Sequence, residues 1–188
     1  MEAFFVSAAV VAIAEIGDKT QLLAVILATR YRKPIPIIFG ILAATLANHA
    51  LAAWIGAEIA AWVGVDTMRW ILGISFIVMA GWCLIPDKAD DGPQAARQAG
   101  AFVATLVAFF IVEIGDKTQI ATVALAARFQ SLIAVTAGTT FGMLLANAPV
   151  VLFGDAIAQR LPLHIVRVVA ALLFVALGLA ALLMPSSP

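Results

Sequence analysis

Long apolar runs separated by short polar stretches dominate the pattern of this chain. A hydrocarbon core about 30 Å thick requires about 20 apolar residues of helix to cross it. Six runs approach or exceed that length: 3–29, 34–62, 69–85, 101–127, 132–158 and 163–183. Each is expected to be helical, because lipid offers the backbone no hydrogen-bond partners, and the longer runs are expected to tilt or break. The pattern predicts an all-α integral membrane protein with six transmembrane helices.

The composition supports this class of protein and excludes others. Hydrophobic residues make up 64% of the 188 residues, against about 45–50% in average globular proteins. The 11 basic and 11 acidic residues cancel, so net charge indicates no nucleic-acid partner. The single cysteine, Cys83, excludes a disulfide framework. We therefore expect the function to reside within the bilayer.

One polar segment, containing prolines, aspartates and a glycine, interrupts the apolar pattern at residues 86–99. It predicts a first three-helix repeat over 1–85, a cytoplasmic linker over 86–100 and a second three-helix repeat over 101–188. Cytoplasmic loops carry an excess of Lys and Arg. Seven such residues fall on the linker side (Arg30, Arg32, Lys33, Lys88, Arg97, Arg160 and Arg167) and two on the other (Arg69 and Arg128). Both termini are thus expected outside the cytoplasm, with the protein in the inner cell membrane.

The two halves share a seven-residue motif. Residues 15–21 read EIGDKTQ, and the same letters recur at residues 113–119, an offset of 98. Three helices per half is an odd number, so the second half enters the membrane from the opposite side. Such inverted repeats are typical of secondary transporters, whose sites lie near the midplane at the repeat interface. The alternative is a duplication that merely builds a helix bundle. The same offset also pairs Arg30 with Arg128, Gly40 with Gly138, Gly56 with Gly154, Arg69 with Arg167 and Phe76 with Phe174.

The motifs place ionisable residues near the centres of the first and fourth runs. Each such group costs roughly 2.5–3.5 kcal/mol at a helix centre, so six cost on the order of 15–20 kcal/mol. A cost of this size persists only if the groups face each other, water or an ion. The six are Glu15, Asp18, Lys19, Glu113, Asp116 and Lys117.

On an unbroken helix, Glu15, Asp18 and Gln21 would form one slanting stripe, with Lys19 beside Glu15. Gly17 between the acids is a place where the helix can loosen. The second motif would present the same stripe, giving four carboxylates and two carboxamides around one midplane cavity. The predicted metal ligands are Glu15, Asp18, Glu113 and Asp116; the supporting ligands are Gln21, Gln119, Thr20 and Thr118; the charge-balancing residues are Lys19 and Lys117.

The charge of this predicted cavity indicates its ligand. Four acids and two lysines leave a formal charge of −2, which one divalent cation neutralises. Oxygen ligands suit Ca²⁺, Mg²⁺ and Mn²⁺. Without the ion, clustered carboxylates repel, so some should hold protons that an arriving metal displaces. This predicts metal–proton antiport, with the cation as substrate and no permanent cofactor.

Other interpretations of the polar residues stay open. Glu15–Lys19 and Glu113–Lys117 are also spaced as structural i, i+4 pairs. Asn48, His49 and Asn147, midway along the second and fifth runs, are candidates for a second shell of the cavity, although polar residues more commonly join helices. Glycines in these runs indicate close helix packing: Gly40, Gly56, Gly138, Gly142 and Gly154.

With these residues in view, the chain resembles the Gdt-type family of membrane cation transporters, which carries two copies of Glu-x-Gly-Asp-(Lys/Arg)-(Thr/Ser). Residues 15–20 and 113–118 match both copies, and the layout of three helices, polar linker and three helices matches too. The resemblance implies Mn²⁺ and Ca²⁺ as substrates, exchanged for protons, with the motif acids as ligands. For bacterial members it implies manganese export from the cytoplasm.

Two other classes of protein compete with the transporter. A passive cation channel would use the same acids as a filter, and an intramembrane hydrolase would pair Asp18 with Asp116. The inverted halves favour a transporter over a channel, and a doubled Glu–Asp set with lysines fits a dyad poorly. The expected partners are divalent cations, protons and the lipid bilayer. The sequence leaves the oligomeric state and the choice between Mn²⁺ and Ca²⁺ open.

Overall fold

The computed structural model describes residues 1–85, 100–154 and 163–183. Within these residues the chain forms eight helices and no strands. The helices are α1 (Glu2–Glu15), α2 (Lys19–Tyr31), α3 (Pro34–Trp62), α4 (Val65–Cys83), α5 (Ala101–Glu113), α6 (Lys117–Phe129), α7 (Leu132–Phe153) and α9 (Leu163–Leu182). The fold is all-α, as the apolar runs predict.

The first and fourth predicted runs are each divided in two. The run 3–29 forms α1 and α2, and the run 101–127 forms α5 and α6, with both breaks inside the repeated motif. The other four runs correspond to α3, α4, α7 and α9. The predicted linker at 86–99 and the end of the run 132–158 lie outside the described residues.

The duplication extends to the way the helices end. Helix α2 ends at Arg32 (φ 50°) and α6 at Gln130 (φ 48°), two left-handed caps 98 residues apart. The cap N–H groups donate to the carbonyl oxygens of Ala28 and Ala126. Returning bonds of this kind satisfy carbonyls that a helix C-terminus leaves without partners.

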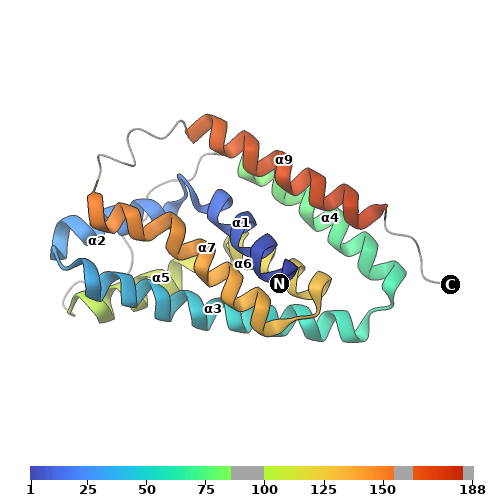
Figure 1. The fold of residues 1–188 in the computed structure, drawn as a ribbon, viewed down its shortest axis with the longest axis horizontal. Coiled ribbons are helices and arrows are strands. Elements are labelled where there is room, and N and C mark those ends of the chain that lie inside the picture. The colour runs from blue at the N-terminus through green and yellow to red at the C-terminus, as the bar shows by residue number, and fades with distance from the viewer. Residues whose placement is uncertain (86–99, 155–162, 184–188) are drawn as a thin grey trace.

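The chain runs along the long axis of the molecule in alternating directions (Figure 1). The α2–α3 junction lies at one end of this axis, and the α3–α4 junction lies at the other. When α1 and α2 are counted as one pass along this axis, and α5 and α6 as another, each pass runs in the opposite direction to the one before it. Helix α1 begins near the middle of the long axis, whereas α5 begins near the end where α2 meets α3.

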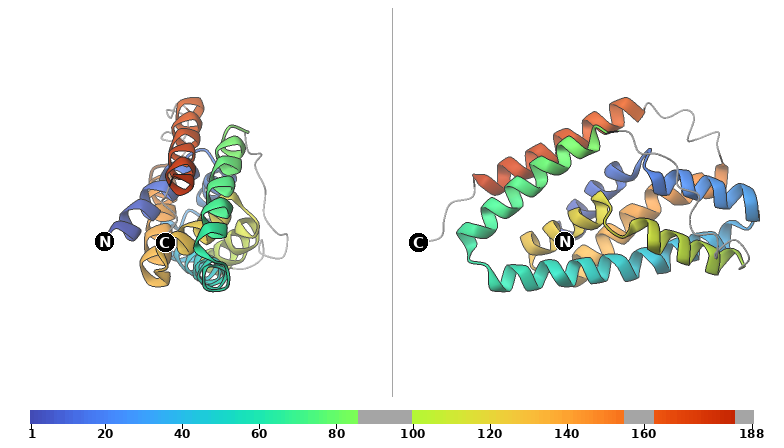
Figure 2. Two further views of the ribbon diagram at one scale, coloured as in Figure 1. Left: turned by 90° about the vertical axis from the view of Figure 1, so that its right-hand side faces the viewer. Right: turned by 180° about the vertical axis from the view of Figure 1, so that it is seen from behind.

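The two halves are interleaved rather than separate. Helix α1 packs on α7 of the other half, and α5 packs on α3. Helices α4 and α9 lie side by side as a pair (Figure 2). Within this pair the rings of Phe76 and Phe174 stack with centroids 6.2 Å apart. These two residues are 98 positions apart, so a residue contacts its own duplicate.

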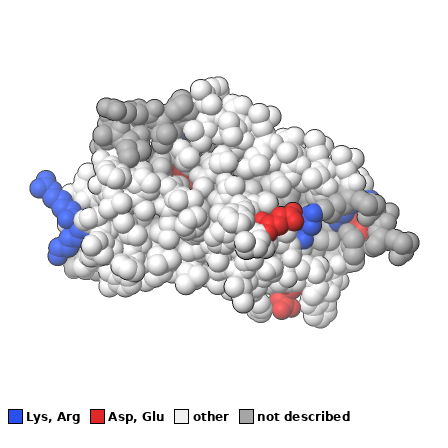
Figure 3. Space-filling view, in the orientation of Figure 1, with Lys and Arg blue, Asp and Glu red and all other residues white. Residues whose placement is uncertain are grey.

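Most of the molecular surface is apolar. Figure 3 shows an almost uncharged face, with charged side chains confined to a few places. Large hydrophobic side chains such as Ile133, Leu172 and Val78 are 80%, 63% and 61% exposed, far more apolar exposure than a soluble monomer presents. Three of the described helices are long and apolar enough to cross a membrane: Pro34–Trp62, Leu132–Phe153 and His164–Leu182. The surface and the helices indicate a membrane protein.

Four of the five predicted packing glycines lie where helices approach closely. A Cβ atom at Gly40 would lie 2.7 Å from Cβ of Thr105, and one at Gly138 would meet the carbonyl oxygen of Phe4. Gly56 and Gly142 similarly face backbone atoms of α6 and α1. At Gly154 no atom of the described residues lies within 4 Å of an added Cβ; this glycine ends α7 with φ 68°.

The contact at Gly138 predicts that Gly138→Ala destabilises the protein by about 1–3 kcal/mol, since the added methyl meets rigid backbone. The measurement is thermal unfolding of the purified protein in detergent, followed by tryptophan fluorescence. Gly81→Ala is the matched control, because Gly81 lies inside α4 and an added Cβ there has no atom of the described residues within 4 Å. Equal loss of stability in both variants would contradict the packing role of Gly138.

Candidate cation site

The repeated motif breaks two helices in the same way. Helix α1 ends at Glu15, Ile16 is extended (φ −64°, ψ 117°) and Gly17 has φ 79°. Ile114 (φ −62°, ψ 121°) and Gly115 (φ 76°) repeat this conformation. A positive φ strains residues with a side chain and favours glycine. The stripe expected on one unbroken helix is therefore wrong, because the glycine turns the chain between the acids.

At each helix break, the glutamine of the same motif accepts a hydrogen bond from the backbone of the turn. The N–H of Gly17 donates to Oε1 of Gln21 over 2.8 Å, and that of Gly115 to Oε1 of Gln119 over 2.7 Å. Backbone amides in a lipid-surrounded interior need such partners. The carboxamide oxygens, predicted as supporting ligands, thus already accept one hydrogen bond each.

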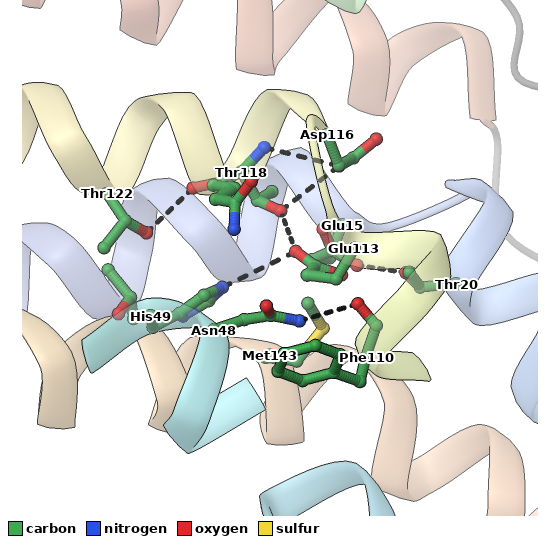
Figure 4. Close-up of polar contacts among 12 residues, drawn as sticks. Glu15, Thr20, Asn48, His49, Phe110, Glu113, Asp116, Thr118, Thr122 and Met143 are labelled. Atoms are coloured by element: carbon green, nitrogen blue, oxygen red, sulfur yellow. Dashed lines mark hydrogen bonds and ion pairs between the residues drawn. The ribbon is translucent and has the colours of Figure 1, made fainter. Parts of the chain in front are cut away.

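The threonine of each motif holds the glutamate. Thr20 Oγ1 donates to Oε2 of Glu15, and Thr118 Oγ1 donates to Oε1 of Glu113 over 2.6 Å. Figure 4 shows the two glutamates side by side, each with its threonine. One carboxylate oxygen on each glutamate is thereby fixed, and the direction of the other oxygen follows from it.

Lysines and aspartates pair between the halves. Lys19 Nζ lies 2.9 Å from Oδ1 of Asp116, and Lys117 Nζ forms the reciprocal ion pair with Oδ1 of Asp18. The i, i+4 pairing of Lys19 with Glu15 is wrong, because the break turns Lys19 toward the other half. In these pairs, each of the two aspartates that a hydrolase dyad would join is paired with a lysine.

Three acids converge in the interior. Glu15, Glu113 and Asp116 each offer an oxygen within 4.8 Å of the others, and all three are buried. Oε1 of Glu15 and Oε2 of Glu113 are buried without a hydrogen-bond partner among the described residues. Unpaired buried carboxylate oxygens are costly, so the position calls for protons or a cation. Asp18, the fourth predicted ligand, is engaged by Lys117.

Helix α3 adds two polar residues beside this group. Asn48 Nδ2 donates to the carbonyl oxygen of Phe110 over 3.0 Å and so joins α3 to α5. His49 is fully buried, and its Nε2 lies 3.5 Å from Oε1 of Glu113 (Figure 4). Asn147 on α7 instead donates to the carbonyl oxygen of Met143 in its own helix over 3.1 Å.

The surroundings of the two motifs differ. Gln21 Nε2 donates to the carbonyl oxygen of Ala146 over 3.1 Å, which joins α2 to α7. Gln119 in the other motif borders a pocket of about 300 Å³ between α3, α5 and α6. The pocket is lined by Asn48, Leu51, Ala52, Ile55, Phe110, Ile114, Gln119, Ile120 and Val123.

Sequence reasoning missed the carbonyl oxygens of Phe110 and Ala146, since no side-chain pattern marks a backbone acceptor. It also missed Thr122, whose hydroxyl donates to the carbonyl oxygen of Thr118 over 2.8 Å. Thr118 and Thr122 are four residues apart on one buried helical face, a spacing that was available as a signal.

An apolar helical exterior around a buried group of acids defines an integral membrane protein with a candidate site for a cation. The family described as "Divalent cation/proton antiporter GDT1" matches residues 3–91 and 101–187. The chain belongs to this family, whose members are transporters and not enzymes.

Individual relatives agree with the family. A Vibrio cholerae protein described as "Putative manganese exporter" is 55% identical over 181 residues, covering 96% of this chain and 90% of the relative. "GDT1-like protein 4" of Oryza sativa subsp. indica is 24% identical over 210 residues, covering 98% and 74%. No solved structure matches the chain.

The reciprocal ion pairs lead to a prediction about stability. Lys117→Met should destabilise the protein by about 3–5 kcal/mol, because it leaves Asp18 charged and buried. Adding Asp18→Asn should restore part of that loss. Stability is measured by unfolding in detergent, and the coupling comes from a double-mutant cycle.

The control for this cycle pairs Lys117→Met with Glu113→Gln, the i, i+4 neighbour in the motif. That pair should show the smaller coupling. A coupling at least as large between Lys117 and Glu113 as between Lys117 and Asp18 would contradict the pairing between halves.

Proposed function

We propose that this protein exports a divalent cation, Mn²⁺, from the cytoplasm in exchange for protons. The observation that carries this function is the buried group of carboxylates contributed by both motifs. Family membership supports the exchange of a divalent cation for protons. The name of the Vibrio cholerae relative supports manganese and the outward direction.

In the proposed architecture, six transmembrane passes form two inverted three-helix repeats, 1–85 and 101–188, joined by a cytoplasmic linker at 86–100. The alternating direction of the passes supports this arrangement. The reciprocal pairs Lys19–Asp116 and Lys117–Asp18 also support it, since a two-fold axis exchanges one pair for the other. Both termini then lie outside the cytoplasm, in the inner membrane.

The glutamates are the proposed centre of the cation site. Two lysines neutralise two aspartates, so Glu15 and Glu113 carry the remaining formal charge of −2. One divalent cation or two protons balance that charge, and the two occupants exclude each other. Asp116 and Asp18 complete the four-carboxylate site, with Thr20, Thr118, Gln21 and Gln119 as supporting oxygen donors around it.

The helix breaks favour such a site electrostatically. The N-termini of α2 and α6 begin at Lys19 and Lys117 beside the acids, and the positive end of a helix dipole stabilises negative charge. Helices α1 and α5 end at the glutamates, where terminal carbonyl groups favour a cation. Broken helices that meet at a midplane site are a recurrent feature of secondary transporters.

The pocket beside Gln119 is the proposed route to the site. It reaches Asn48 and Phe110, close to Glu113, whereas the equivalent position beside Gln21 is bridged to Ala146. The two approaches thus differ, and such a difference is compatible with alternating access.

The principal test is flux in proteoliposomes loaded with a pH-sensitive dye. A pH gradient should drive Mn²⁺ uptake, and Mn²⁺ entry should move protons the opposite way. An Mn²⁺ flux that does not depend on the pH gradient would contradict antiport and would favour a passive channel. Ca²⁺ transport at the same rate and affinity would favour a Ca²⁺/H⁺ antiporter instead.

Neutralising the acids tests the site. Glu15→Gln and Glu113→Gln should each lower the Mn²⁺ transport rate by at least about tenfold, because each removes a ligand and an exchangeable proton. Glu58→Gln is the control, since Glu58 lies on the exposed end of α3. Folding of every variant is checked by gel filtration in detergent, and its insertion by the amount recovered in the membrane fraction. Wild-type rates in both glutamate variants would exclude the site.

Filling the pocket tests the route. Val123→Phe should slow Mn²⁺ flux severalfold while leaving Mn²⁺ binding in detergent unchanged, because the ring obstructs the pocket and touches no acid. Val103→Phe, on the half-exposed outer face of α5, is the control. Unaltered flux in Val123→Phe would show that the pocket is not the route.

A further inference from the structure

We propose that His49 is a direct nitrogen ligand of the transported cation and sets its preference for first-row transition ions such as Mn²⁺ over Ca²⁺ and Mg²⁺. This inference rests on the proposed function and adds a ligand outside the two motifs. It is carried by the position, burial and missing hydrogen bonds of one imidazole ring.

The ring of His49 is aimed at the acids but forms no hydrogen bond with them. His49 is fully buried, and neither Nδ1 nor Nε2 has a hydrogen-bond partner among the described residues. Nε2 lies 3.5 Å from Oε1 of Glu113, which is beyond the usual 2.7–3.2 Å or so of an N–H···O bond. A buried imidazole without partners is costly unless a ligand engages it.

The spacing that is too long for a hydrogen bond suits two ligands of one ion. Metal–ligand distances of about 2.0–2.6 Å place two donor atoms on a common ion about 3–5 Å apart. The 3.5 Å between His49 Nε2 and Glu113 Oε1 falls in this range. Glu113 belongs both to this pair and to the three acids whose oxygens lie within 4.8 Å of one another.

Neighbouring contacts hold the ring in place. Asn48, the preceding residue, donates to the carbonyl oxygen of Phe110, three residues before Glu113 on α5. This bond fixes the register of α3 against α5 and so presents His49 to Glu113. A ligand held by such outer contacts is pre-organised for its ion.

The duplication gives His49 no histidine counterpart in the second half. The motif acids occur in both halves, but the position 98 residues after His49 is Asn147. Asn147 donates to Met143 in its own helix. The acids alone are hard oxygen ligands that suit Ca²⁺ and Mg²⁺ as well as Mn²⁺, whereas first-row transition ions also accept imidazole nitrogen. A nitrogen ligand from His49 would thus favour first-row transition ions over Ca²⁺ and Mg²⁺.

Electron spin-echo modulation of Mn²⁺ bound to the purified protein tests this ligand directly. The wild type should show ¹⁴N modulation, which changes when histidine alone is labelled with ¹⁵N. The chain has two histidines, His49 and His164. His49→Asn, which copies the other half, should abolish the histidine modulation, and His164→Asn should leave it unchanged.

Binding titrations of the same variants measure the preference. In His49→Asn, Mn²⁺ affinity should fall by at least about tenfold, with Ca²⁺ affinity changing much less. His49→Gln is a second variant, whose side chain fills more of the space left by the ring. In either variant, an equal loss of affinity for Mn²⁺ and Ca²⁺ would indicate a folding defect rather than the loss of a ligand.

Three results would overturn the inference. Wild-type protein that binds Mn²⁺ without histidine modulation would exclude the nitrogen ligand and leave the carboxylate antiporter standing. Equal losses of Mn²⁺ and Ca²⁺ affinity in both His49 variants would assign the ring a structural role. Wild-type protein that binds no Mn²⁺ would overturn the proposed function together with this ligand.

Discussion

The structure depends on keeping charged side chains paired in an interior surrounded by lipid. Asp18 and Asp116 are almost fully buried, and each obtains its lysine from the other half of the chain. A half folded alone would leave a buried carboxylate without that lysine, which is strongly unfavourable. The halves must therefore assemble together, and their interleaving, with α1 on α7 and α5 on α3, follows from this constraint.

The residues of the motif depend on one another, because together they stabilise a helix break inside the membrane. Breaking a helix inside a membrane exposes backbone groups, and the break needs a residue that tolerates positive φ. Gly17 supplies the turn, Gln21 satisfies its N–H, and Thr20 fixes the carboxylate of Glu15. Replacing any one of these residues leaves a strained or unsatisfied group that the others do not compensate. Local backbone chemistry and the charged site thus constrain the same seven positions.

Periodicity and apolar length predicted the helices well, because the hydrophobic match to a bilayer is a strong and local signal. They allowed the longer runs to tilt or break but did not decide between these outcomes, since an unbroken helix and a broken one share the same apolar run. The partners of Lys19 were also beyond the sequence: its i+4 spacing from Glu15 indicates a local pair, and only the turn at Gly17 directs it to Asp116. The duplication at an offset of 98 correctly indicated that both motifs contribute to one place. It gave no reason to expect that His49 approaches Glu113 while Asn147 turns into its own helix.

The two copies of the motif have identical sequences but pack against different neighbours. Gln21 and Gln119 each accept a hydrogen bond from the glycine N–H of their own motif, but among the described contacts Gln21 alone also donates to a carbonyl on a neighbouring long helix, that of Ala146. Since the motif letters are the same, the difference lies in how α2 sits against α7 and α6 against α3. If the proposed exchanger alternates between two approaches to the site, these two packings are the contacts that must change. An exchanger needs two arrangements of similar energy, and the same seven letters in both halves are compatible with that requirement.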